Sequence, residues 1–267
     1  MSTALAHATF QELWQPNIIV FTVVVLVLYL GLCHGPLAQR LSGTRHLVTP
    51  LQTGLFVVGM ILLYFSFAGP LDYLSDNYLY TAHMLQHMVE ITIMTPLIMK
   101  GLPESVYRVL FTSRRLLPIT KAWTHPIVSG AVFNLILTLF HLPYLYNLAL
   151  ESDSFHLFEH SVFFVISFFM WLPIVRGTAL KKQMTPGQKM LYLLYNYNLM
   201  MPLVVFQLVA NRPWYAHYVD APRIFPNLSA LGDMQLGAIT MMIFMATRYA
   251  IVGIQQYMKQ DESVWYE

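Results

Sequence analysis

Charged residues are scarce in this sequence. Asp, Glu, Lys and Arg together make up 10% of its 267 residues, whereas soluble domains carry about 25%. Hydrophobic residues account for 57%, which is more than a large buried core explains. The composition excludes an ordinary soluble domain and offers no basic surface for nucleic acid. We therefore expect an integral membrane protein embedded in a lipid bilayer.

Cysteine is nearly absent as well. Cys33 is the single cysteine, which excludes a disulfide within the chain and a cysteine-based metal cluster. The first 16 residues contain no Lys or Arg, and no small-residue cleavage site follows the first apolar run. Both absences argue against a removed signal peptide, so we expect the first apolar run to be a retained membrane span.

Long apolar runs are what the sequence does contain. A bilayer core of ~30 Å is crossed by about 20 apolar residues in a helix. The sequence predicts an all-α, polytopic membrane protein with seven transmembrane helices in a single domain, residues 1–267. The predicted spans lie near residues 17–34, 51–68, 79–100, 126–142, 155–175, 189–210 and 232–256.

Basic residues are distributed unevenly between the predicted loops. Thirteen of the fifteen Lys and Arg residues lie in or beside residues 35–50, 101–125 and 176–188 and in the C-terminal part. The loops between these connections hold only Arg212 and Arg223. Cytoplasmic loops carry the excess of positive charge. We therefore predict that the N-terminus lies outside and the C-terminus in the cytoplasm.

Two histidines stand inside the third predicted span, in the stretch TAHMLQHMVEIT. His83 and His87 are four residues apart, so on a helix their imidazoles lie on one face. Ionisable groups within membrane spans are rare and usually face the bundle interior. One such pair is nevertheless more often structural, hydrogen-bonded to a neighbouring helix, than a metal site.

Three further predicted spans carry metal-ligating side chains at the same outer level. His141 ends the fourth span, His156 and His160 stand at the start of the fifth, and Asp233 begins the seventh. Because four spans direct such groups to one layer, we interpret the layer as a metal site, in which a carboxylate such as Glu90 or Glu159 can orient an imidazole. The candidate ligands are His83, His87, His141, His156, His160, Asp233, Met234 and Met241.

The residue types narrow the choice of metal. Imidazole suits zinc, copper, iron and nickel, whereas thioether sulfur favours Cu(I). Met234 and Met241 therefore favour copper as Cu(I), with zinc as the alternative. Met84 and Met88 are expected to be weaker candidates, because they cannot fully share a helix face with the neighbouring histidines. Most of the sixteen methionines are expected to pack in the core.

These residues also resemble a known family. HMLQHM, FHLPYLYNLAL, HLFEHSVFF and APRIFPNLSALGDMQL, followed by Met241, occur in the order found in the Bacillus-type CtaG family. Its members are assembly factors for caa(3)-type cytochrome c oxidase. The resemblance extends from about residue 50 to about residue 245. It implies a metallochaperone that delivers copper to the Cu(B) centre of the oxidase, and no enzymatic activity.

The resemblance also implies site residues, partners and a location. His83 and His87 correspond to the family motif HMxQHM, His141 to WHxPxLY, His156 and His160 to HxxEH, and Asp233 to the acidic residue before the last span. Phe140 and Met242 depart from the family pattern, which often has Trp at both positions. The implied partners are the oxidase subunit that carries Cu(B) and an extracytoplasmic copper chaperone. The implied location is a bacterial plasma membrane, with the metal site near the extracytoplasmic face.

Other interpretations stay open at this point. A seven-span zinc hydrolase would use the histidines and Asp233 as ligands with a free carboxylate as general base. A haem b protein would place two histidines from different spans on either side of an iron. A copper transporter would need ligands in the inner half of the membrane, where the sequence offers little beyond Cys33, His34 and Met99. The sequence also leaves open a homodimer.

Overall fold

The computed structural model describes residues 8–123, 125–175 and 184–264. All regular elements in this part of the chain are helices, as predicted. They are α2 (Phe10–Trp14), α3 (Pro16–Cys33), α4 (Gly35–Ser42), α5 (Pro50–Ser66), α6 (Pro70–Asn77), α7 (Tyr80–Val89), the π-helix η1 (Glu90–Met94), α8 (Thr95–Gly101), α9 (Glu104–Thr112), α10 (Leu117–Trp123), α11 (Pro126–Phe140), α12 (Pro143–Glu151), α13 (Asp153–Val175), α14 (Pro186–Leu208), α15 (Ala216–Asp220) and α16 (Ala230–Val264).

Five stretches of helix are long and apolar enough to cross a membrane, which confirms a membrane protein. They are Phe10–Cys33, Pro50–Asn77, Asp153–Val175, Pro186–Leu208 and Ala230–Met258. The helices α10 and α11 form a sixth candidate if the pair, bent by 79°, is counted as one span. The predicted span at residues 79–100 corresponds to three consecutive shorter helices, α7, η1 and α8. The count of seven spans and the orientation of the two ends stay predictions.

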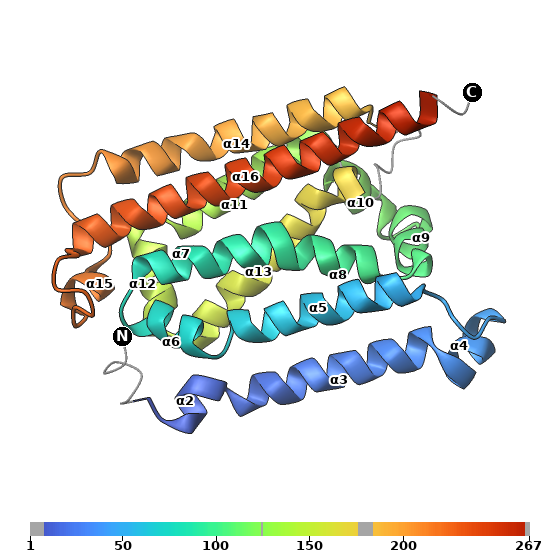
Figure 1. Ribbon diagram of the computed structural model, residues 1–267, viewed down its shortest axis with the longest axis horizontal. Helices are drawn as coiled ribbons and strands as arrows, with labels where there is room; N and C mark the ends of the chain where they lie inside the picture. The colour runs from blue at the N-terminus through green and yellow to red at the C-terminus, as the bar shows by residue number, and fades with distance from the viewer. Residues whose placement is uncertain (1–7, 124, 176–183, 265–267) are drawn as a thin grey trace.

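The short helices mark two ends of a helical bundle (Figure 1). One end carries α4, α9 and α10, and the other carries α6, α12 and α15. The segment of α7, η1 and α8 runs through the middle, whereas α3 lies at the edge against α5. Apolar side chains on the outer side of α3, such as Val20, Phe21 and Val27, are exposed, as expected for a lipid-facing helix. Because α7 lies in the middle of the bundle, its polar side chains are shielded from the lipid.

A short π-helix interrupts the central segment directly after α7. Pro96 has no N–H group, so carbonyls in the preceding turn lose a helical partner. Side chains of other helices donate hydrogen bonds to these carbonyls. The Trp171 Nε1–H donates to the Ile91 oxygen at 2.7 Å, and the Arg248 Nε–H donates to the Thr92 oxygen at 2.8 Å. The irregular backbone is therefore satisfied within the protein, as the membrane interior requires. π-Bulges of this kind are frequent at functional sites.

The Trp171 bond gives a direct test of this arrangement. In Trp171→Phe the Ile91 carbonyl stays buried without its donor, which is expected to lower the free energy of unfolding by about 1 to 3 kcal/mol. Thermal unfolding of the detergent-solubilised protein, followed by circular dichroism, measures the loss. Trp123, which packs against Phe169 with ring centroids 5.2 Å apart, provides the control in Trp123→Phe. Equal stability of Trp171→Phe and the unchanged protein would contradict the role of this bond.

Candidate metal centre

The centre begins with the two histidines of α7. Their ring centroids lie 4.3 Å apart, and both side chains are fully buried. Neither His83 nor His87 has a hydrogen-bond partner for either ring nitrogen among the described residues. Buried polar groups are normally hydrogen-bonded, and leaving one unpaired is costly. A neutral imidazole has one N–H and one nitrogen lone pair, so these two rings offer two unused lone pairs that could bind a metal ion.

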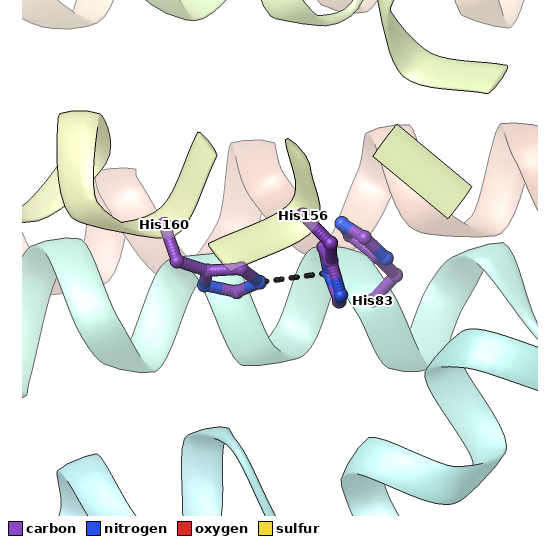
Figure 2. Close-up of side chains that lie close together, drawn as sticks. All are labelled: His83, His156 and His160. Atoms are coloured by element: carbon purple, nitrogen blue, oxygen red, sulfur yellow. Dashed lines mark hydrogen bonds between the residues drawn. The ribbon is translucent and has the colours of Figure 1, made fainter. Parts of the chain in front are cut away.

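The helix α13 lies against this face and supplies two more imidazoles. His160 Nδ1 lies 2.7 Å from Glu90 Oε2, so it donates to the carboxylate when the ring is neutral. The lone pair of His160 is then on Nε2, which faces His156 Nε2 at 3.0 Å. Figure 2 shows this contact and the ring of His83 beside that of His156, with ring centroids 5.4 Å apart. The Glu90 carboxylate, at the start of the π-helix, thus fixes which His160 nitrogen faces the centre.

Two overlapping sets of three side chains bring their ligand atoms within 4.8 Å of one another. One set is His83, His156 and His160, and the other is His83, His87 and Glu159. Neither oxygen of the buried Glu159 carboxylate has a hydrogen-bond partner in the described part of the chain. Ligand atoms around a tetrahedral ion with bonds of about 2.0–2.1 Å lie roughly 3.3 Å apart. Small side-chain rotations therefore suffice to bring either set to bonding distance, and the residues fit a metal ion.

A sulfur and a fifth imidazole lie next to these sets. His141 directly follows α11, and its Nδ1–H donates to the Leu137 carbonyl at 2.7 Å. Its Nε2 lone pair consequently faces the Met84 sulfur, 3.3 Å away. The rings of His141 and His87 have centroids 6.1 Å apart. The thioether that touches a candidate ligand is thus Met84, which the sequence ranked below Met234 and Met241.

The three remaining predicted ligands lie in neither set. Asp233 accepts hydrogen bonds from the Tyr80 N–H at 2.8 Å, the Thr81 N–H at 3.1 Å and the Thr81 hydroxyl at 2.6 Å. It therefore caps the N-terminus of α7, where a negative charge is favourable. The Met234 sulfur accepts from the Trp214 N–H at 3.4 Å. Met241 is fully buried in the apolar core.

A close approach of two helices makes this cap feasible. A Cβ atom added at Gly237 of α16 would overlap the Tyr80 ring of α7. The absence of a side chain at Gly237 therefore lets α16 come close to the start of α7, where Asp233 reaches the free N–H groups. Asp233 thereby holds the helix that carries His83 and His87.

The centre is closest to the surface at His156. The His156 side chain is 14% exposed, whereas His83, His87 and His160 are fully buried. Asp76 of α6 lies beside it, with Oδ2 4.0 Å from His156 Nδ1, and is 34% exposed. The sequence pattern did not single out Asp76, although two acidic residues in the short stretch LDYLSDN were a usable signal. An ion that approaches from the end of α6 meets a carboxylate and an imidazole first.

The apolar helices and the buried cluster of imidazoles and carboxylates define an all-helical membrane protein with a candidate metal centre in its core. The chain belongs to the family of cytochrome c oxidase caa3 assembly factors (Caa3_CtaG), whose family model matches residues 27–259. This match confirms the family resemblance and includes every predicted ligand. No curated protein and no solved structure matches the chain.

Proposed function

We propose that this assembly factor binds copper as Cu(I) at the buried cluster and delivers it toward the Cu(B) centre of the oxidase. The observation that supports this most strongly is the gathering of unpaired donor atoms from His83, His87 and Glu159 in a fully buried place. An ion held there is cargo, which must be released to the oxidase. The overlap of the two ligand sets at His83 suits such release, because an ion can exchange ligands without leaving the cluster.

The proposal includes the sidedness derived from the basic residues. With seven spans and the N-terminus outside, the end that carries α6, α12 and α15 faces the extracytoplasmic side of a bacterial plasma membrane. Asp76 and His156 then form the mouth of the site, where an extracytoplasmic copper chaperone would present its ion. The acceptor is the oxidase subunit that carries Cu(B).

The donor set suits a soft ion. Imidazole nitrogens bind copper well, and a thioether favours Cu(I) over harder ions. The Met84 sulfur lies 3.3 Å from the His141 lone pair, so a nitrogen and a sulfur donor face each other at the edge of the cluster. The rings of His83 and His87 lie on one helix with centroids 4.3 Å apart, so this pair leaves no room for a porphyrin, and a haem would need two histidines from different helices.

One observation favours a second candidate, a zinc-dependent hydrolase. His83, His87 and Glu159 form a set of two histidines and one glutamate, which is a known ligand set of catalytic zinc. Glu90 Oε1 is buried without a hydrogen-bond partner among the described residues and offers a general base. Zinc at one equivalent in protein purified from cells, with hydrolysis that Glu90→Gln abolishes, would support this candidate over copper delivery.

The copper proposal is tested on the oxidase itself. Cells that express the unchanged protein, His87→Leu or His125→Leu are grown with limiting copper, and the copper content of the purified oxidase is measured. His125 is an exposed residue before α11 and serves as the matched control. We expect oxidase with markedly reduced Cu(B) occupancy from His87→Leu only. Full occupancy with His87→Leu would overturn the proposal.

A further inference from the structure

A second pair of histidines faces each other at the other end of the bundle. His34 and His46 form an isolated antiparallel β-bridge. Backbone bonds flank the pair, from the Gly35 N–H to the Arg45 oxygen at 2.8 Å and from the Leu47 N–H to the Cys33 oxygen at 2.9 Å. This pattern makes His34 and His46 a non-hydrogen-bonded pair, in which opposite side chains lie closest. The backbone therefore holds the two imidazoles side by side on one face.

Hydrogen bonds determine which nitrogen of His34 is free. The Thr53 hydroxyl donates to the Thr49 carbonyl at 3.2 Å, so its oxygen accepts at 2.9 Å from His34 Nε2. A neutral His34 then has its lone pair on Nδ1. That nitrogen faces His46 Nδ1 at 3.0 Å. Two nitrogens bound to one tetrahedral ion at about 2.0–2.1 Å lie roughly 3.3 Å apart, so the pair is already within a few tenths of an ångström of the spacing of two metal ligands.

We propose that His34 and His46 form a second metal site, for a borderline divalent ion such as Zn²⁺. The two Nδ1 atoms bind the ion, and His46, whose ring is exposed, keeps its proton on Nε2. An open cleft of about 690 Å³ adjoins both rings, and the residues that line it include no carboxylate or thiol. Imidazole without carboxylate selects zinc, copper or nickel over calcium or magnesium. Water completes the coordination from the open side.

The site is separate from the histidine cluster of the core. His34 directly precedes α4, which lies at the opposite end of the bundle from α6 and α12 (Figure 1). A bound ion would join the turn after α3 to the segment that leads into α5. Thr53, in the first turn of α5, positions His34 and does not bind the ion. We therefore expect the ion to stiffen the connection between α3 and α5.

The test measures how many zinc ions bind to each molecule of the full-length protein in detergent. After equilibrium dialysis with Zn²⁺, His46→Ala and His34→Ala are each expected to hold one equivalent less than the unchanged protein, and His125→Ala the same amount. Thr53→Val is expected to weaken binding at this site about tenfold, as loss of a bond that orients a ligand does. Zn²⁺ is also expected to protect His34 and His46 from carbethoxylation, and to raise the unfolding temperature of the unchanged protein by more than that of His46→Ala.

Unchanged zinc content in His46→Ala, or equal carbethoxylation of both histidines with and without Zn²⁺, would overturn the site and leave a plain hydrogen bond between the rings. His46 is exposed, so its replacement keeps the test valid if His34→Ala does not fold. The substitution His87→Leu, in contrast, removes the metal equivalent bound at the central cluster and leaves the one at His34 and His46. A result that contradicts the second metal site therefore leaves the copper proposal untouched, and the reverse also holds.

Discussion

Replacing His87 by leucine is expected to weaken Cu(I) binding more than about a hundredfold, since even residues that only orient a ligand change metal affinity by about 10- to 100-fold. His87 is fully buried, and neither of its ring nitrogens has a hydrogen-bond partner in the described chain. Its main role is therefore one that the metal-free protein does not use. Competition with a chromophoric Cu(I) chelator measures the affinity.

The same substitution is expected to weaken metal binding without lowering the stability of the metal-free protein. Leucine is apolar and of similar size, so it removes a buried polar group that has no partner. Such a group costs about 1 to 3 kcal/mol, and the metal-free His87→Leu protein should be as stable as the unchanged protein or more stable. His125→Leu is the control for both measurements. Unchanged Cu(I) affinity, or a large loss of stability without metal, would show that His87 is a structural residue.

Replacing Asp233 by alanine is expected to lower the free energy of unfolding by about 2 to 4 kcal/mol, from lost charge-assisted hydrogen bonds and a lost helix cap. Its carboxylate accepts from two backbone N–H groups and one hydroxyl at the start of α7. Asp233→Asn keeps one acceptor oxygen and should lose less. Chemical or thermal unfolding of the metal-free protein in detergent measures both.

The affinity for Cu(I) then distinguishes a role of Asp233 as the cap of α7 from a role as a metal ligand. If Asp233 only caps α7, the folded Asp233→Asn protein should bind Cu(I) with nearly unchanged affinity. Gln235, two residues further along α16, whose amide donates to the Leu208 carbonyl at 3.0 Å, gives a matched comparison in Gln235→Ala. A hundredfold loss of affinity in Asp233→Asn alone would instead place Asp233 among the ligands, as the sequence predicted.

The helical class of the fold follows from composition and apolar runs alone. The four-residue spacing of His83 and His87 also sufficed to predict that both rings share a face, and their centroids lie 4.3 Å apart. The gathering of α7, α11 and α13 was inferred from depth in the membrane. Ring centroids of 4.8 Å for His87 and His160, and of 6.1 Å for His87 and His141, agree with it. The metal itself stays a prediction.

Other features depend on packing that periodicity does not encode. A π-helix begins at Glu90, so a regular count of 3.6 residues per turn misplaces the side chains beyond that residue. The bond from His160 to Glu90 joins residues 70 positions apart and requires the neighbouring helix to be known. Met84 and Met241 both lie in the apolar core, but it is Met84 that also touches His141. Thioether side chains are flexible and turn toward whichever neighbour is close, so sequence position alone did not identify this contact.

The most direct test is the anomalous scattering of a crystal of the copper-loaded protein at the copper edge. The account predicts a copper peak within bonding distance of a ring nitrogen of His83 and of either a histidine nitrogen or a glutamate oxygen of α13. A copper-loaded crystal with no peak between α7 and α13, and with these side chains unmoved, would contradict it.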